Sequence, residues 1–329
     1  MEKQQNFTDL EYTNRRRTTK REAFLEKMDA TLPWDAWVRL ALPIYPNGKR
    51  GRPPQEIERM LRMTMLQTWF NLSDEGIEDA IYDSYAMKTF MRIDFSIGEQ
   101  VPDATTLCKF RKLLTEHGLQ QKFFAQVQEL LAKEGRLVHG GTIVDATIIE
   151  APNSTKNKDK KRDPEMHSTK KNTKYYFGMR AHIGTDPYYG FVHTVVSTAA
   201  NEAEGKVAAK LLRDSDTVVY GDAGYLKMDK YVTDGIQREY RINRQRGTFK
   251  RHYGDGLSWQ YEKELEQQKS RTRWKVEYAF HIVKDIFRWR KLRYKGIHKN
   301  DCHANLLFAS ANLLMLADMK TQKLSTAVG

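Results

Sequence analysis

Three carboxylates occupy positions where a charged side chain is costly. Asp145 interrupts the β-branched run Thr142–Ile149, Asp222 follows the apolar run Thr217–Gly221, and Glu277 lies on a predicted helix beside its apolar face. A buried carboxylate needs a hydrogen-bonded partner or a metal ion to offset its lost hydration. If neighbouring strands bring the two aspartates together and the helix lays the glutamate across them, three like charges meet in one place. We therefore expect divalent cations to neutralise them.

The chemistry expected of such a site is phosphodiester cleavage. Ligation by oxygen alone suits Mg²⁺, with Mn²⁺ as a substitute, and does not suit Zn²⁺. Two such ions about 3.5–4 Å apart can activate an attacking oxygen and stabilise a leaving one. Each acid has another reading: Asp145 satisfies a backbone turn, Asp222 caps the next helix, or Glu277 pairs with Arg273 or His281. Together, on strand, strand end and helix, they favour a ribonuclease-H-like metal nuclease.

The segment Arg271–Arg290 has helical periodicity and contains no Gly or Pro. One predicted face is apolar, with Val276, Phe280, Val283 and Phe287. The stripe beside it carries Arg273, Glu277, His281, Lys284 and Arg288. A solvated, salt-bridged face is the alternative reading of this stripe. The upstream aspartates favour a site in which the glutamate binds metal and the cations bind phosphate.

The charge of the chain indicates an acidic partner. Its 329 residues have a net charge of +13 and a pI of about 9.5. Residues 244–300 hold 16 Lys and Arg against 6 Asp and Glu, and residues 156–174 hold 8 against 3. Basic charge concentrated around candidate acids favours nucleic acid as the partner. No apolar run approaches the roughly 18 residues that span a bilayer, and the N-terminus lacks an apolar signal core, so we expect a cytoplasmic protein. Cys108 and Cys302 lack metal or disulfide spacing and are expected to be structural.

The order of predicted elements indicates an all-helical region followed by an α/β domain. We predict a basic N-terminal arm with a short helix over 1–52, and a helical DNA-binding domain over 53–136. A catalytic domain with a mixed five-stranded sheet and flanking helices follows over 137–318. The polar stretch 153–174 is predicted to be a long loop, 244–269 a flexible insertion and 319–329 a disordered tail.

Two basic segments of the first part are candidate DNA contacts. Arg50 and Arg52 lie in an extended Gly-Arg-Pro segment that is narrow enough for a minor groove, or else in a basic loop before a helix. Lys109 and Arg111 lie on the outward edge of a predicted helix, which is either a recognition surface or a solvated face. The helical domain is compatible with a helix-turn-helix-like pair.

The residues also match a known family. The chain resembles bacterial insertion-sequence transposases of the Asp-Asp-Glu type, in particular the group-five insertion-sequence family. The matching stretches are GRPP at 51–54, PDATTLCKFRKLL at 102–114, VDATIIEAP at 144–152, TKNKDKKRDPEMHSTKKNTKYYFGMRAHIG at 155–184, GDAGY at 221–225, R-x3-E-x6-K at 273–284 and RYKG-x2-KND at 293–301. The resemblance covers roughly residues 40–318.

This resemblance implies a ribonuclease-H-like catalytic domain with Asp145, Asp222 and Glu277 as metal ligands. It also assigns phosphate binding to Arg273 and Lys284. The related signature has a tyrosine three residues before the arginine, where this chain has Ser270.

The function that the resemblance implies is DNA transposition. The expected partners are the terminal inverted repeats of the element and a target DNA, bound by a homodimer or higher oligomer in the bacterial cytoplasm. A metal-activated water is expected to cut at the element end, and the freed 3′ hydroxyl then attacks the target. The alternatives are a catalytically silent DNA-binding protein or repressor derived from a transposase, and a nuclease that cuts without joining.

Overall fold

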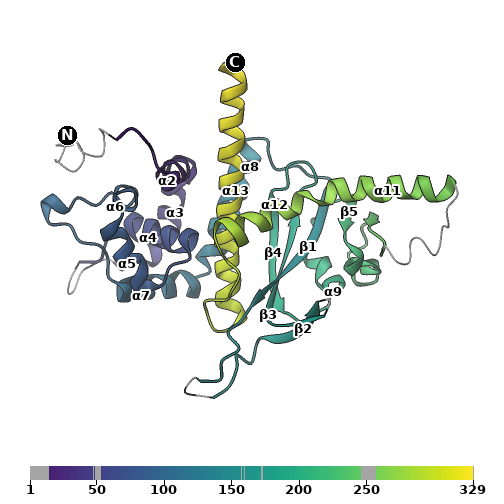
Figure 1. Cartoon of the computed structure of the whole chain (residues 1–329), viewed down its shortest axis with the longest axis horizontal. Coiled ribbons are helices and arrows are strands. Elements are labelled where there is room, and N and C mark those ends of the chain that lie inside the picture. Colours follow the sequence, from purple (N-terminus) through teal and green to yellow (C-terminus); the bar gives the residue numbers. More distant parts are fainter. Residues whose placement is uncertain are drawn as a thin grey trace. The chain divides into compact units, whose positions relative to one another are not determined.

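The computed structural model describes residues 15–46, 48, 53–156, 158, 160–171, 173–245 and 257–328. The chain forms two compact units. The first comprises residues up to Leu119 together with those from Leu313 onward, and the second comprises Gln120–Asn312 (Figure 1). The predicted boundary at residue 136 therefore differs from the division between the units, because the helix α8, Leu119–Lys133, belongs almost entirely to the second.

The first unit is helical, as its sequence periodicity predicts. Its helices are α2 (Lys20–Thr31), α3 (Trp34–Ala41), α4 (Ile57–Phe70), α5 (Asp74–Asp83), α6 (Tyr85–Met91) and α7 (Ala104–Glu116). Helix α4 is buried on nearly every side, including the charged residue Arg62. The Arg62 guanidinium is paired at 2.8 Å with both Asp29 and Glu58, and it donates to the carbonyl of Phe90. These partners offset the cost of burying the charge.

The described part of the N-terminal arm, residues 15–46, is largely helical. Residues 20–31 form α2, which begins with a capping box in which Thr19 and Glu22 each accept from the other's backbone N–H. Leu25 and Met28 of this helix are buried. A capping box typically stabilises a helix start by about 1 kcal/mol, so the basic sequence in this region does not prevent helix formation.

The second unit is built on a mixed sheet of six strands. These are β1 (Gly141–Glu150), β2 (His167–Lys171), β3 (Lys174–Thr185), β4 (Val192–Ala199), β5 (Val218–Gly221) and β6 (Glu239–Ile242). Strand β3 pairs antiparallel with β1, β2 and β4, whereas β1, β5 and β6 run parallel to one another. The five predicted strands are confirmed, but β2 was missed and lies within the predicted loop. Its sequence, HSTKK, has no apolar alternation because the strand is exposed.

Helices cover the two faces of this sheet differently. On one face, Val144 of β1 and Val219 of β5 pack with Ala208, Leu211 and Tyr225. Ala208 belongs to the short helix α9 (Glu204–Ala208), and Leu211 and Tyr225 belong to 3₁₀ turns near it. The helix α12, Lys275–His281, contacts β1, and α11, Leu257–Arg273, contacts β5 (Figure 1).

Two predictions about irregular segments are wrong. Of the expected flexible insertion 244–269, residues 246–256 lie outside the described residues and 257–269 form most of α11. The prediction rested on the Gly and charged residues of the stretch, but its Glu, Lys and Gln residues are good helix formers, and pairs such as Glu266–Lys269 at 2.8 Å stabilise the turn. The expected disordered tail continues the helix α13, Ile297–Val328. No helix in the described part of the chain combines the length and apolar character needed to cross a membrane.

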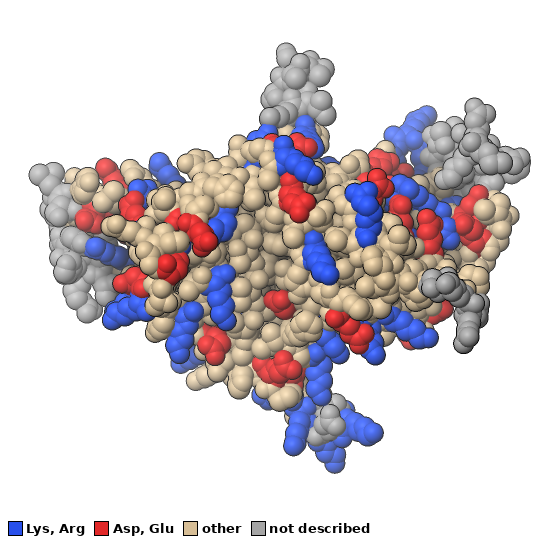
Figure 2. Space-filling view, turned by 180° about the vertical axis from the view of Figure 1, so that it is seen from behind, with Lys and Arg blue, Asp and Glu red and all other residues tan. Residues whose placement is uncertain are grey.

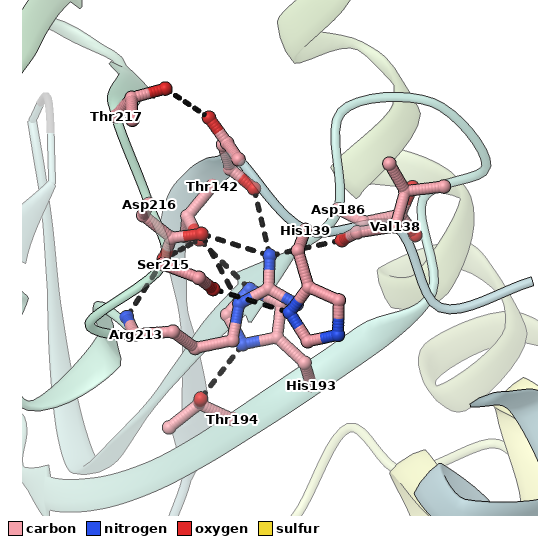
Figure 3. A network of polar contacts seen from close by, with 12 residues as sticks. Val138, His139, Thr142, Asp186, His193, Thr194, Arg213, Ser215, Asp216 and Thr217 are labelled. Carbon is pink, nitrogen blue, oxygen red and sulfur yellow. Dashed lines mark hydrogen bonds and ion pairs between the residues drawn. The ribbon is translucent and has the colours of Figure 1, made fainter.

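A buried polar network fixes the ends of β1 and β5. Asp216 accepts from the hydroxyl of Thr142 and from the backbone and guanidinium of Arg213, while Thr142 also contacts His193 Nε2 at 3.0 Å. Figure 3 shows these side chains pointing toward one another. Arg213 further donates to the carbonyl of Gly141 at 3.0 Å. The network ties the start of β1 to the turn before β5, and so helps to set the alignment of the two strands.

The protonation states of this network predict loss of stability in acid. Burial, together with the charge of Arg213, lowers the pKa of His193 to about 3, far below its value of 6.5 in an unfolded chain. The unfolded state therefore takes up a proton below pH 6.5 that the folded state does not. The free energy of unfolding consequently decreases as the pH is lowered. Between pH 7.5 and pH 5 the loss from His193 should be about 2 kcal/mol.

Urea unfolding of wild type and His193→Gln at the two pH values measures this contribution. The variant should be less stable overall because it loses hydrogen bonds, yet its stability should change less between the two pH values. An equal pH dependence in both proteins would show that His193 is not held neutral by the fold.

Candidate active site

The parallel pairing of β1 with β5 brings two of the predicted acids together. Gly141 is paired with Val218 and Ile143 with Tyr220. Asp145 lies two residues after Ile143, and Asp222 lies two residues after Tyr220 with an extended backbone. Side chains two residues apart on a strand point to the same face, so the two carboxylates occupy equivalent positions along neighbouring strands.

The carboxyl of Asp145 is in an environment that disfavours its charge. Burial raises its pKa to about 7, and the negative charges of Asp222 and Glu204 add to this effect. A hydrogen bond from the Ala146 N–H at 2.7 Å and the positive charge of Arg273 act in the opposite direction. Its side chain is only 16% exposed. This is the signature of a carboxylate that requires a counter-charge to ionise at neutral pH.

Asp222 begins a tight turn. Its Oδ1 accepts from the Gly224 N–H at 2.8 Å and so caps the 3₁₀ turn Ala223–Tyr225. The alternative reading of Asp222 as a cap is therefore correct for one of its oxygens. The cap also fixes the carboxylate beside Asp145.

The predicted helix 271–290 is interrupted at Trp274, and Arg273 is the last residue of α11. Arg273 Nη1 lies 3.3 Å from Asp145 Oδ2, while Nη2 lies 3.7 Å from Glu277 Oε1. A single guanidinium thus connects Glu277 to Asp145. The side chain of Glu277 is 62% exposed. Arg273 therefore links Glu277 to Asp145 in the structure. The partner predicted for Arg273 was a DNA phosphate.

The apolar stripe of α12 anchors this arrangement. Val276, Val283 and Phe287 are buried, as predicted, and Phe280 packs edge-on against Phe308. The helix widens into a π-helical segment at Ile282–Ile286 and ends at Phe287. The predicted continuation to residue 290 is therefore wrong. π-Helical turns alter the direction in which side chains point and occur frequently at functional sites.

Lys284, in this π-helical segment, lies within electrostatic range of Asp145. Burial lowers the pKa of its ammonium group, and the positive charges of Lys171 and Arg290 lower it further. A lysine crowded by other cations is favourably placed to bind an anion. Arg288, at the end of the same segment, has a positive φ of 58° and is exposed.

The donor set fits a hard divalent cation. Asp145 and Asp222 supply carboxylate oxygens from adjacent strands, and the raised pKa of Asp145 shows that its negative charge lacks sufficient compensation. In the described part of the chain, no three acidic, His or Cys side chains are already arranged as a set of metal ligands. Arg273 provides the counter-charge to Asp145 in this arrangement.

A hollow of about 980 Å³ adjoins Asp222. Its wall includes cations and two aromatic rings, namely Arg244, Lys263, Arg271, Arg273, the half-buried Trp259 and the exposed Trp274. The Ser270 side chain also lines it, where the related signature has a tyrosine, and the Asn243 amide lies 3.3 Å from the Ser270 hydroxyl. Cations and aromatic rings at the edge of an acidic site are suited to a nucleic-acid backbone and its bases.

Other basic side chains are exposed on the second unit. The loop between β1 and β2 carries Lys156, Lys158, Lys160, Lys161 and Arg162, all exposed. Figure 2 shows Lys and Arg gathered at the lower tip of the view, where this loop projects in Figure 1. On the rest of that face both signs of charge are interspersed.

The predicted DNA contacts of the first unit have different placements. Lys109 is exposed on α7. Arg111 instead forms a bidentate pair with Asp74 at 2.6 and 2.8 Å, which favours a structural role over the predicted DNA contact. Arg50 and Arg52 lie outside the described residues.

Sequence reasoning missed Glu204 and Tyr225, whose side chains lie near the two aspartates. Glu204 is the first residue of a five-residue helix in a polar stretch, and Tyr225 is the last residue of GDAGY. The proximity of Tyr225 to Asp222 in the sequence was a usable signal. No sequence signal pointed to Glu204.

Two family models match the chain, one in its N-terminal part and one in its C-terminal part. Residues 136–313 match a family described as transposase DDE domain. Residues 13–113 match a second family described as a transposase domain. The first match, together with the mixed sheet and its flanking helices, confirms the ribonuclease-H-like fold. It also supports a nuclease that acts on DNA, of a kind that generally uses divalent metal ions. The chain belongs to the family of DDE-domain transposases.

Proposed function

We propose that this protein is the transposase of a group-five insertion sequence, which cuts DNA at the element ends and joins them to a target. The observation that supports this best is the placement of Asp145 beside Asp222 on parallel strands, with Glu277 connected to Asp145 through Arg273. Asp145, Asp222 and Glu277 are the proposed ligands of two Mg²⁺ ions, with Mn²⁺ as a substitute. Bound divalent ions supply charge stabilisation for the attacking and leaving oxygens of a phosphodiester.

The side chains around the acids have complementary tasks in this proposal. In the DNA-free chain the Arg273 guanidinium compensates the charge of Asp145. Once Asp145 is otherwise neutralised, that guanidinium is available for a DNA phosphate. Lys284 holds a second phosphate, because it is already crowded by other cations and gains from an anion. Arg288 contacts the same strand of DNA.

The DNA path that we propose runs over the hollow beside Asp222. Arg271 and Lys263 on α11 bind the backbone there, and Trp259 and Trp274 stack with bases. Lys109 and the basic N-terminal segment with Arg50 and Arg52 bind the terminal inverted repeat. Bringing two element ends together requires at least a dimer on DNA, in the cytoplasm of a bacterium.

A substitution of Glu277 distinguishes an active transposase from a DNA-binding protein without catalytic activity. Glu277→Gln should reduce Mg²⁺-dependent cleavage and joining of end-bearing DNA by about 100-fold or more, because one charged ligand is removed. The same variant should bind that DNA with near wild-type affinity. The assay measures nicked and joined products on gels, with Glu264→Gln, an exposed glutamate of α11, as the matched control.

Equal activity of wild type and Glu277→Gln would reject the assignment of Glu277. Cleavage without any joined product would instead identify a hydrolytic nuclease. Absence of cleavage by wild type at every divalent ion concentration would favour the repressor reading.

Removal of the buried charge of Asp145 should stabilise the ion-free protein. Its pKa in the folded chain, about 7, exceeds the unfolded value of 3.8, so ionisation opposes folding increasingly as pH rises toward and above 7. At pH 8 this cost is on the order of 4 kcal/mol. Asp145→Asn should therefore raise the thermal midpoint by several degrees in chelator at pH 8, and less at pH 5. A lower midpoint at pH 8 would mean that the pair with Arg273 outweighs the burial cost.

Salt dependence tests the DNA path. Arg271→Ala should weaken DNA binding and make the plot of log affinity against log salt shallower by about 0.9, the value for one lost phosphate contact. Lys210→Ala, which removes an exposed cation from the turn after α9, should leave the slope unchanged. Fluorescence anisotropy at four salt concentrations gives both slopes, and identical slopes for the two variants would remove the hollow from the proposed path.

A further inference from the structure

Glu204 directs its carboxylate to the same small volume as Asp222. The helix α9 begins at Glu204 and contacts both β1 and the turn that follows β5. A Cβ built on Gly224 would clash with Glu204 Oε2 and would lie 3.0 Å from Asp222 Oδ1. The two acidic oxygens therefore approach the same point from opposite elements, and the absence of a side chain at residue 224 leaves that space open.

The charges of these acids affect one another. Burial raises the pKa of Glu204, and the charge of Asp222 adds to the effect, while Arg180 opposes it from 2.9 Å. The charge of Glu204 in turn helps to raise the pKa of Asp145. Asp222 and Glu204 are thus close neighbours, and Asp145 lies within electrostatic range of both, although the three acids are not yet arranged as a set of ligands in the ion-free chain.

A buried hydroxyl lies within electrostatic range of the same acids. Tyr225 is fully buried, and its Oη has no hydrogen-bond partner within the described residues. Its pKa is raised by burial and by the charges of Asp145, Glu204 and Asp222, which places the hydroxyl within electrostatic reach of all three. A buried hydroxyl without a hydrogen-bond partner is unfavourable, because it has lost its hydrogen bonds to water. A hydrated cation held by the acids would supply the missing partner.

We propose that Glu204 is a fourth carboxylate of the ion site, which with Asp145 and Asp222 binds a divalent cation before DNA arrives. This inference rests on the proposed metal-dependent function for the identity of the site. Glu277 is exposed and paired with Arg273 in the DNA-free chain, and it remains a ligand of the proposed two-ion site. Arg180 also donates to the carbonyl of Glu202 at 3.1 Å, a contact that does not depend on Glu204. Tyr225 hydrogen-bonds to the hydration shell of the cation.

Manganese binding to the full chain without DNA tests this proposal. Free Mn²⁺ is measured by electron paramagnetic resonance during titration of wild type, Glu204→Gln and Glu202→Gln. Glu202 is an exposed acid two residues from Glu204 and serves as the matched control. We expect Glu204→Gln to bind Mn²⁺ about 10-fold more weakly or worse, because ligand charge count sets affinity. Glu202→Gln should stay within about 2-fold of wild type.

Wild-type affinity in Glu204→Gln would overturn the proposal, as would a loss in Glu202→Gln equal to that in Glu204→Gln. Tyr225→Phe keeps the ring and removes only the hydroxyl, and we expect about a 10-fold loss. Unchanged affinity in Tyr225→Phe would remove the tyrosine from the site. Circular dichroism spectra confirm that each variant is folded, and Glu204→Asp should retain part of the affinity that Glu204→Gln loses.

The two proposals fail in different ways. If wild type cleaves end-bearing DNA while Glu204→Gln binds Mn²⁺ as wild type does, the role of Glu204 is rejected and the transposase function stands. If wild type binds Mn²⁺ through Glu204 but neither cuts nor joins DNA, the proposed function is rejected and the ion site stands.

Discussion

The parallel alignment of β1 with β5 is the constraint on which the site depends. It is this register that sets a buried aspartate on one strand beside the aspartate that follows the other. A shift of one residue would turn Asp145 toward the opposite face, where Val144 now packs with Tyr225. The polar network around Asp216 anchors the start of both strands by hydrogen bonds to Thr142 and Arg213. The hydrogen bonds of this buried network therefore help to position the two aspartates further along the same strands.

The excess negative charge at the end of these strands explains the basic residues around it. Arg273 reaches Asp145 from α11, Arg180 reaches Glu204 from β3, and Lys284 approaches from the π-helical segment. Each cation comes from a different element. Such a shell of cations around a group of acids both stabilises the ion-free fold and provides donors for phosphates.

The sequence predicted the parts of the site that have strong local patterns. The apolar runs identified β1 and β5, and an acid inside or directly after such a run identified Asp145 and Asp222. It could not predict β2, whose exposed residues are polar, or the interruption at Trp274, which is not marked by Gly or Pro. Arg111 looked like a free surface cation because Asp74, its partner, is 37 residues away in the chain. Glu204 was missed for the same reason, since only the folded sheet brings α9 to Asp222.

The helix α13 has a consequence for the order in which the molecule is made. Leu313 lies within this helix, and the residues from there onward belong to the compact unit formed by the N-terminal helices. Asp318 of that segment pairs with Lys27 at 2.5 Å. During synthesis on a ribosome, the N-terminal unit therefore lacks its last segment until the whole sheet unit has been translated. A chain that stops before residue 313 would carry every proposed catalytic acid and still leave its first unit incomplete.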